Sequence, residues 1–275
     1  MSSVYPAFDN PALREAVRRA KESFPFFVRE QSWEQRRIVK ALGLSAVKLS
    51  FDVPKGGDAP ETEHMWISDV GFDGKTVSGT LLNGSDYIPG MVPGRDVSAP
   101  FERLDDWMYV CDGMVCGGFT VQAMRADMGA VEREGHDEAW GLPFTDPALC
   151  NITPFAAEKS KPASGLSRLW KKAPASPGLP YREALAHARA HEHPMSENAR
   201  ESIAESLRAS PEWVTQPMED GWTVLHKEAF AGNLAPVEVL LELGADRDAR
   251  TPDGRTPMDL AKAMGWDRIV QALTR

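Results

Sequence analysis

The sequence predicts two structural classes in one chain of 275 residues: an α+β domain with an antiparallel sheet and helices, then an all-α module of helical repeats. Two observations predict the sheet. Asp73-Gly74 and Asp112-Gly113 each separate two segments of strand pattern, and such pairs are strong signals for two-residue hairpins. A third observation predicts the repeats, because Gly221 and Gly254 open similar segments 33 residues apart.

The first part of the chain predicts two helices and then several strands. Asn10 can cap the first helix and Pro11 suits its first position, and a second helix is predicted from Trp33 to Leu42, ending at Gly43. Alternating apolar residues predict strands at 46–53, 64–72, 76–82, 108–111 and from 114 onward, with further alternation over 119–123. Helices followed by antiparallel strands are typical of an α+β domain, which we place at residues 1–150.

Residues 151–180 differ in composition from the segments on either side. Serine, proline, alanine and lysine dominate from residue 156 to residue 180. Such a segment has too little apolar surface to order itself by burial, so we predict an interdomain linker. Leu166, Leu169 and Trp170 are spaced to form a short docked helix within it.

The second module is placed at residues 181–275. Helical periodicity predicts helices at Tyr181–His191 and Glu197–Ala209, and two similar units follow them. The first unit opens Gly221-Trp222-Thr223-Val224-Leu225-His226 and the second opens Gly254-Arg255-Thr256-Pro257-Met258-Asp259. The threonine of each unit suits the N-cap of a helix, and glycine permits the positive φ that reverses the chain.

These units resemble ankyrin repeats, which open Gly-x-Thr-Pro-Leu-His and end in a leucine-rich helix followed by a Gly-Ala-Asp turn, as here at residues 239–246. About three units are normally needed for stability, so the helices predicted upstream are expected to act as a degenerate repeat or cap. The resemblance implies a protein-binding face on the hairpin tips and first helices. Carried over by position, that face contains Glu219, Asp220, Trp222, Phe230, Pro252, Asp253, Arg255 and Met264. In the alternative reading, Trp222 and Phe230 pack inside the protein.

Residues 11–128 resemble a bacterial family of uncharacterised proteins, domain of unknown function 2314. The motifs that carry the resemblance are Glu63-His64-Met65-Trp66-Ile67, Gly79-x-Leu81-x-Asn83, Asp106-Trp107 and Gly117-Gly118-Phe119-Thr120. The resemblance implies a fold unit and a bacterial origin, and it brings no established activity.

The candidates for acid–base chemistry are Glu63, His64 and Asp106. A strand pattern follows Glu63 and His64, instead of the helix that would place metal ligands one turn apart. The sequence also lacks a phosphate-binding loop and a nucleophile elbow, so we expect no catalytic residue, metal or cofactor. We interpret the histidines at 187, 191 and 193 as a solvated helix end, and Trp66 and Trp107 as core residues.

Composition limits the choice of partner and compartment. The net charge is −9, and both structured segments carry more acidic than basic residues, which argues against nucleic acid and favours a protein partner with a basic surface. Three cysteines are too few for a disulfide framework. No stretch approaches the roughly 18 apolar residues of a membrane span, and no signal peptide is evident, so we expect a cytoplasmic protein and no membrane partner.

The leading hypothesis is therefore a bacterial protein-binding protein, in a specific version an immunity-type protein that neutralises a toxin by occluding it. The alternative is an enzyme or small-ligand-binding domain regulated by the ankyrin module. A pocket that holds Glu63, His64 and Asp106 together would favour this alternative. A third hypothesis, a structural adaptor, differs from the first only in the identity of the partner.

Overall fold

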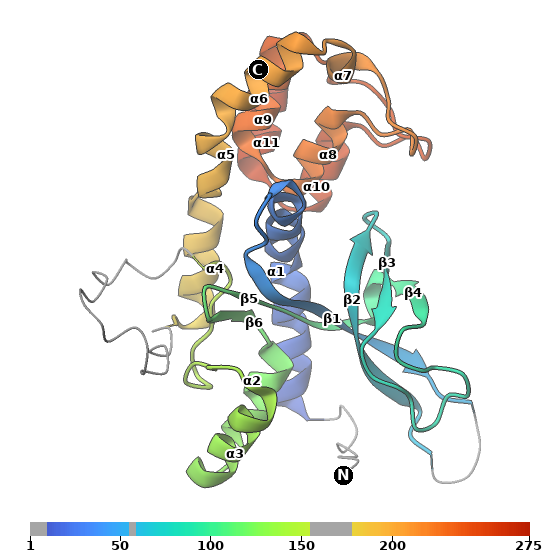
Figure 1. Cartoon of the computed structure of the whole chain (residues 1–275), viewed down its shortest axis with the longest axis vertical. Coiled ribbons are helices and arrows are strands. Elements are labelled where there is room, and N and C mark those ends of the chain that lie inside the picture. Colours follow the sequence, from blue (N-terminus) through green and yellow to red (C-terminus); the bar gives the residue numbers. More distant parts are fainter. Residues whose placement is uncertain (1–9, 55–58, 155–177) are drawn as a thin grey trace. The chain divides into compact units, whose positions relative to one another are not determined.

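The computed structural model describes residues 10–54, 59–154 and 178–275, and the chain forms two compact units (Figure 1). The first unit contains the residues up to Phe27 and residues Arg37–His187, and the second contains Val28–Arg36 and Ala188–Arg275. The units thus differ from the expected domains in two places, since 28–36 group with the repeats and 181–187 with the first unit. The expected linker, with its short helix at Leu166, Leu169 and Trp170, falls largely outside the described residues.

The first unit contains an antiparallel sheet, as the sequence predicted, and the sheet has six strands, of which the one at residues 96–100 was not predicted. The strand order is β4-β3-β2-β1-β5-β6. The strands are β1 (Leu42–Asp52), β2 (Thr62–Phe72), β3 (Thr76–Leu81), β4 (Asp96–Pro100), β5 (Leu104–Cys111) and β6 (Met114–Gly117). Asp112 and Gly113 both have positive φ, 50° and 76°, which is the conformation that a two-residue hairpin between β5 and β6 requires.

Helix α1 (Pro11–Arg36) packs side chains of its N-terminal part against one face of the sheet. Its start agrees with the sequence, because the Asn10 side chain accepts a hydrogen bond from the backbone N–H of Ala12 at 2.8 Å. In the core, the indole of Trp107 donates to the Ala20 carbonyl at 3.0 Å, and Phe27 contacts the Trp107 ring at 5.8 Å between centroids. A single helix therefore supplies residues to both units.

The predicted second helix over Trp33–Leu42 is wrong. Trp33 belongs to α1, and Leu42 begins β1, where it pairs with Cys111. The next register pair is Leu44 with Val110, so Gly43 is the extra residue of a β-bulge. A glycine that follows an apolar segment suits a helix C-cap or a bulge equally well. Here the pairing of β1 with β5 shows that it forms a bulge.

The predicted strand over 119–123 is also wrong, because these residues form helix α2 (Phe119–Ala126). Gly117 and Gly118, with φ of 76° and 72°, reverse the chain in front of the helix. A Cβ atom at Gly117 would lie 2.1 Å from the carbonyl oxygen of Trp107, so no larger residue fits there. Helix α3 (Ala130–Trp140) follows α2 and was not predicted.

A second apolar cluster lies on the opposite face of the sheet. It contains Met108 and Val115 from the strands, Val121 from α2 and Phe144 from the segment after α3. Helix α4 (Tyr181–Ala190) begins in this unit, where the Tyr181 ring meets Phe119 edge to face at 5.7 Å. Phe119 also meets the Trp107 ring, at 5.6 Å between centroids, so α2 contributes side chains to the core on both faces of the sheet.

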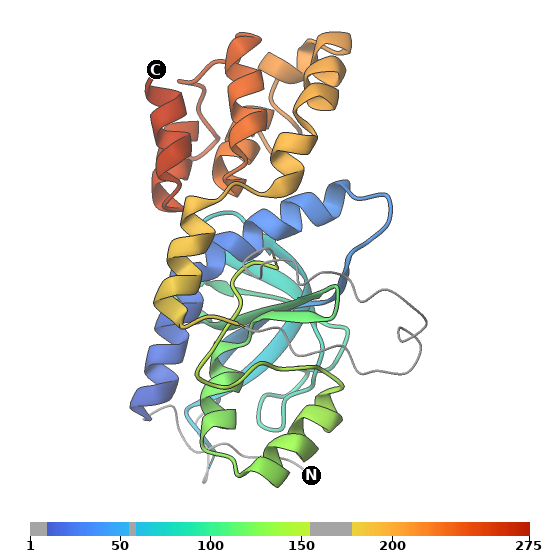
Figure 2. The ribbon, with the colours of Figure 1, turned by 90° about the vertical axis from the view of Figure 1, so that its left-hand side faces the viewer.

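The second unit is a stack of short helices (Figure 2). They are α5 (Pro194–Asn198), α6 (Arg200–Ala209), α7 (Glu212–Thr215), α8 (Val224–Ala231), α9 (Leu234–Glu242), α10 (Pro257–Ala263) and α11 (Asp267–Thr274). Thr223 and Thr256 form the predicted caps of α8 and α10, each within a capping box. The predicted helix over Glu197–Ala209 is divided at Ala199.

The described residues include all three cysteines and the helices of both units. Cys111, Cys116 and Cys150 are all buried free thiols, in agreement with the low cysteine count. Among the residues that the structure describes, none of the helices combines the length and the apolar character needed to cross a membrane.

Candidate functional site

The hairpin tips of the two repeats share one backbone geometry. In the first tip, Met218 N donates to the Trp222 carbonyl at 2.8 Å, and in the second, Thr251 N donates to the Arg255 carbonyl at 2.9 Å. The tips touch each other, because a Cβ atom at Gly221 would lie 2.5 Å from Cγ of Pro252. Gly221 has a φ of 76°, so both its conformation and its surroundings require glycine.

Trp222 is the centre of this tip surface. Its ring meets Phe230 edge to face, with 5.4 Å between centroids and 85° between planes. The guanidinium of Arg255, from the neighbouring repeat, lies 5.4 Å from the centre of the Trp222 ring. Asp253 forms an ion pair with that arginine, with 2.9 Å between Oδ2 and the arginine Nε. The half-buried indole is therefore fixed from two repeats before any partner binds.

Acidic residues surround this tryptophan. Glu219, Asp220 and Asp253 are exposed, and Asp220 pairs with Lys227 at 2.7 Å. Burial acts to raise the pKa of Asp220, but hydrogen bonds from Lys227 and from the Trp222 backbone N–H outweigh it and lower that pKa below its ordinary value. Asp220 is therefore ionised at neutral pH, where it is paired with Lys227, as Asp253 is paired with Arg255.

Two of the residues expected on the binding face lie in the core instead. Phe230 is 6% exposed and Met264 is 8% exposed. Phe230 is covered by Trp222, and its carbonyl accepts a hydrogen bond from the Trp266 indole at 2.9 Å. The candidate surface is therefore narrower than the family resemblance implied. It contains the residues Glu219, Asp220, Trp222, Pro252, Asp253 and Arg255.

Sequence reasoning missed one aromatic residue close to this surface along the chain. Trp213 lies on α7, which directly precedes the first tip, and it is 51% exposed. The available signal was a tryptophan two residues after Pro211, in a segment that was interpreted only as the end of a helix. A single exposed apolar side chain is common on protein surfaces, so Trp213 alone does not indicate a partner.

The base of the stack, beyond the opposite ends of α8 and α10, is occupied by the end of α1. The Trp33 ring stacks on His193, with 5.5 Å between centroids and 13° between planes. Glu30 Oε2 lies 3.1 Å from His193 Nε2, and Met195 N donates to His193 Nδ1 at 3.1 Å. His193 is 1% exposed, so the expectation of a solvated histidine cluster is wrong for this residue.

The same contact explains an irregular feature of the first repeat. Glu228 stands where the ankyrin pattern has a small residue, and it is 4% exposed. Arg36 of α1 pairs with its carboxylate, and Asn233 donates to that carboxylate at 2.8 Å. Asn233 also donates to Ser32 at 3.2 Å. The glutamate that departs from the ankyrin pattern thus binds the end of α1. Within this unit, that contact lies away from the tips.

The neutral form of His226 supports the base of the first tip. Its Nδ1 accepts a hydrogen bond from Thr223 N at 3.1 Å, and Nε2 lies 3.0 Å from the Ala249 carbonyl, to which it donates. The ring is 0% exposed, and burial lowers the pKa of His226 below its ordinary value. The folded state therefore binds a proton less readily than the unfolded state does.

This difference predicts how the stability of the second unit depends on pH. As the pH falls from 7 through about 6.5, the unfolded chain protonates His226 while the folded chain does not, so the free energy of unfolding falls. Urea titrations at pH 7.0, 6.0 and 5.5 should show a loss of up to about 1.4 kcal/mol per pH unit. His226→Gln should reduce this slope relative to the wild type. Equal slopes in the wild type and in His226→Gln would contradict the assignment.

The three acid–base candidates of the first unit are not brought together. Glu63 and His64 are consecutive residues of β2, so their side chains leave opposite faces of the sheet. Glu63 accepts hydrogen bonds from Ser85 Oγ and from Asp86 N, the second at 2.8 Å, and so it anchors the loop after β3. His64 Nδ1 lies 2.6 Å from Asp105 Oδ2.

Asp106 forms hydrogen bonds that hold the start of helix α2. Its carboxylate accepts hydrogen bonds from Phe119 N at 3.0 Å and from Thr120 N at 2.7 Å, and so it caps α2. Thr120 Oγ1 also donates to it at 2.6 Å and accepts from Lys48 at 2.7 Å. Burial lowers the pKa of Lys48 and raises that of Asp106, while their opposite charges oppose both shifts. The described residues contain no group of three His, Cys, Asp or Glu side chains placed to hold a metal ion.

Comparisons with known proteins match the two ends of the chain to different families. A family model described as an uncharacterized protein conserved in bacteria, DUF2314, matches residues 10–144, and an ankyrin repeat model matches residues 220–252. The uncharacterized protein YegJ of Escherichia coli strain K12 is 23% identical over 117 residues, which cover 42% of this chain and 69% of YegJ. A potassium channel of rice, AKT1, is 43% identical over 56 residues, which cover 20% of this chain and 6% of the channel.

One relative matches nearly the full chain. A protein of Neisseria meningitidis serogroup B, named as a candidate ankyrin repeat protein, is 36% identical over 265 residues, which cover 96% of this chain and 93% of the relative. The DUF2314 match falls in the first unit except for residues 28–36, and the ankyrin match falls in the second unit. The chain therefore belongs to the family of this meningococcal protein, with a DUF2314 domain at residues 10–144 and an ankyrin repeat at residues 220–252.

Proposed function

We propose that this protein acts by binding another protein through the tip surface of its ankyrin repeats, and that the partner presents a basic surface there. The observation that carries the proposal is the fixed Trp222 ring among exposed acidic side chains. An aromatic anchor inside a polar rim is the usual composition of an energetic hot spot. Because Asp253 and Arg255 already hold the ring in place, little side-chain entropy is lost on binding.

A specific form of the proposal is an immunity-type role, in which the protein occludes a bacterial toxin in the cytoplasm. Its support is the net charge of −9, the small binding module and the similarity to a meningococcal protein named for its ankyrin repeats. Many toxins that act on nucleic acid must present a basic face to it, and an acidic surface complements such a face. A toxin encoded beside this gene would be the protein to test first.

Variants of the tip surface test the proposal. The tagged full chain, Trp222→Ala and Asp253→Lys are expressed in the native host, and the proteins that copurify with each are quantified by mass spectrometry. The expected result is one stoichiometric partner that Trp222→Ala releases, with a Kd raised about 30-fold or more in the purified complex. Asp253→Lys should slow association and reduce its dependence on salt.

The control is Val131→Ala, because Val131 is 84% exposed on α3 of the other unit. This variant should retain the partner in full. A partner that both tip variants retain at wild-type level would show that binding uses a different surface, and recovery of no stoichiometric partner would count against the function as a whole.

A further inference from the structure

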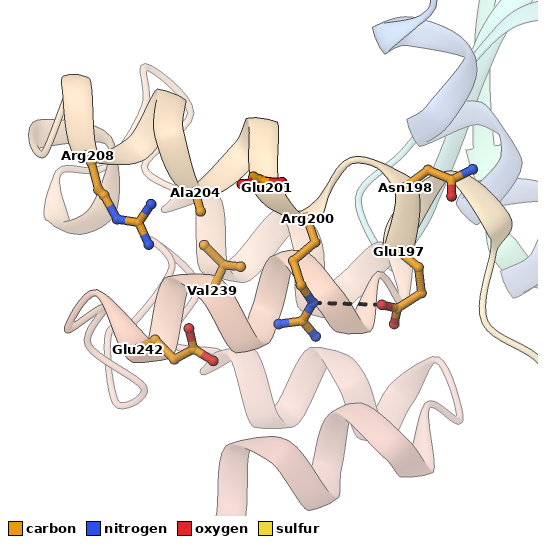
Figure 3. Close-up of a pocket in the computed structure, with 8 residues that line it drawn as sticks. All are labelled: Glu197, Asn198, Arg200, Glu201, Ala204, Arg208, Val239 and Glu242. Carbon is orange, nitrogen blue, oxygen red and sulfur yellow. Dashed lines mark ion pairs between the residues drawn. The ribbon is translucent and has the colours of Figure 1, made fainter.

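A groove on the second unit and a pocket on the first unit differ in the side chains that line them. The groove, of about 500 Å³, lies beside α5, α6 and α9, and its side chains are mainly charged (Figure 3). The pocket, of about 200 Å³, is lined by the start of α1, by α2, by residues 147–150 and by Tyr181, all of the first unit. Much of its wall is apolar and comes from Phe119 and the alanines at 12, 16, 123 and 126. Apolar walls are typical of small-molecule sites, so the pocket is the better candidate.

The charged side chains at the rim of the pocket are already paired within the chain. Glu15 accepts hydrogen bonds from both Arg18 and Arg19, and these hold the pKa of its carboxyl at about 2. The guanidinium of Arg19 also lies 5.2 Å from the centre of the Tyr181 ring, whose hydroxyl donates to Glu22 at 3.0 Å. A charged ligand would have to break one of these interactions to gain an ion pair of its own. The rim therefore favours an uncharged ligand.

The thiol of Cys150 is a buried polar group that these interactions do not use. Cys150 is 6% exposed, and within the described part of the chain its thiol has no hydrogen-bond partner. Both backbone groups of Cys150 bond to Leu179 at 2.9 Å, so the side chain is what this residue offers to the pocket. Burial raises the pKa of the Cys150 thiol to about 12, so the thiol is protonated at neutral pH. The pocket thus contains a weak S–H donor that can interact with a ligand.

Phe119 supplies an aromatic wall that is fixed in place. Its ring meets Trp107 edge to face at 5.6 Å and Tyr181 edge to face at 5.7 Å. Aromatic rings gain more from contact with another ring, offset or edge to face, than the buried area alone provides. Sulfur and S–H groups also interact favourably with aromatic rings. Phe119 and Cys150 therefore favour an aromatic ligand over an aliphatic ligand of the same size.

We propose that this pocket binds a small uncharged aromatic molecule of one ring, seated against Phe119 and the Cys150 thiol. The volume sets the size of the ligand. An apolar protein cavity of about 150 Å³ accommodates benzene, and the pocket of about 200 Å³ leaves room for a short substituent. The residues of the tips belong to the second unit, so this binding does not depend on the proposed protein partner.

Titration of the ¹⁵N-labelled full chain with phenol at pH 7 tests the proposal by NMR. Phenol should shift the backbone amide signals of Ala16, Ala123 and Cys150, with a Kd of roughly 0.1–1 mM for a ligand of this size. Cyclohexanol, the aliphatic counterpart of phenol, should bind at least about threefold more weakly. Benzoate, a charged aromatic molecule, should bind at least about tenfold more weakly, because its charge has no unpaired partner at the rim.

Two variants fill the pocket from α2. Ala123→Leu and Ala126→Phe should each weaken phenol binding at least about tenfold, because the added side chain occupies the space of the ligand. Ala126 is exposed, so its substitution leaves the core unchanged even if Ala123→Leu lowers the stability. Ala130→Leu is the matched control, since Ala130 is exposed on α3 and does not line the pocket. This variant should bind phenol as the wild type does.

Thermal unfolding of each variant shows whether the fold is retained. A wild type that gives no saturable shifts with phenol would overturn the proposal. Phenol binding that both filling variants retain would overturn it as well, because the ligand would then lie elsewhere. Equal Kd values for phenol, cyclohexanol and benzoate would contradict the assignment of an uncharged aromatic ligand.

Discussion

Trp33→Ala is expected to destabilise the ankyrin stack by about 3–5 kcal/mol, the cost of truncating a fully buried tryptophan. Trp33 is 1% exposed, it stacks on His193, and the guanidinium of Arg36 lies 4.6 Å from the centre of its ring. The stack has only two regular repeats, fewer than such arrays normally need. We infer that residues 28–36 supply part of the missing apolar and polar contact.

Hydrogen exchange is the suitable measurement, because it reports the second unit separately from the first. The backbone amides of α8 and α9 should exchange about 10² to 10⁴ times faster in Trp33→Ala, as a loss of about 3–5 kcal/mol requires. Trp213→Ala provides the control, since Trp213 is 51% exposed and its truncation should cost less than about 0.5 kcal/mol. Equal effects of the two substitutions would mean that α1 does not belong to the core of the stack.

The Trp33 contact joins residues far apart in the sequence, and contacts of this kind could not be predicted from local patterns. Hairpins at Asp73-Gly74 and Asp112-Gly113, and helix caps at Thr223 and Thr256, depend on a few adjacent residues, so local patterns predicted them correctly. Glu30 and His193 are 163 residues apart. No local pattern relates two such positions, and the helix that contains Glu30 was therefore assigned only to the first domain.

The same distinction applies to the candidate surface. The repeat period located the two tips, because their positions follow from the 33-residue register. Whether Phe230 and Met264 are exposed depends instead on their neighbours, here Trp222 and the adjoining helices, and the register carries no information about that. The motifs of the DUF2314 resemblance show a similar limit, since Glu63 and Asp106 suggested chemistry while the structure uses them to hold a loop and a helix.

Asp106→Asn is expected to destabilise the first unit by about 3–5 kcal/mol, the usual cost of removing one partner of a buried charge pair. The carboxylate accepts four hydrogen bonds, from Trp107 N, Phe119 N, Thr120 N and Thr120 Oγ1. The NH₂ group of an asparagine would face some of these N–H and O–H groups and could not accept hydrogen bonds from them. The substitution would also remove the opposite charge that acts most strongly on Lys48, which is itself buried.

A double-mutant cycle in urea separates this structural role from a catalytic one. Lys48→Met combined with Asp106→Asn should cost less than the sum of the single variants by about 1–3 kcal/mol, because the buried charge that each single variant strands is then absent. Asp146→Asn is the control, since Asp146 is exposed and accepts one hydrogen bond, from Ala148 N at 2.9 Å. It should cost about 1 kcal/mol or less. If Asp106→Asn left the free energy of unfolding unchanged, the carboxylate would not be needed for the fold, and its four donors would have to be explained by a functional role.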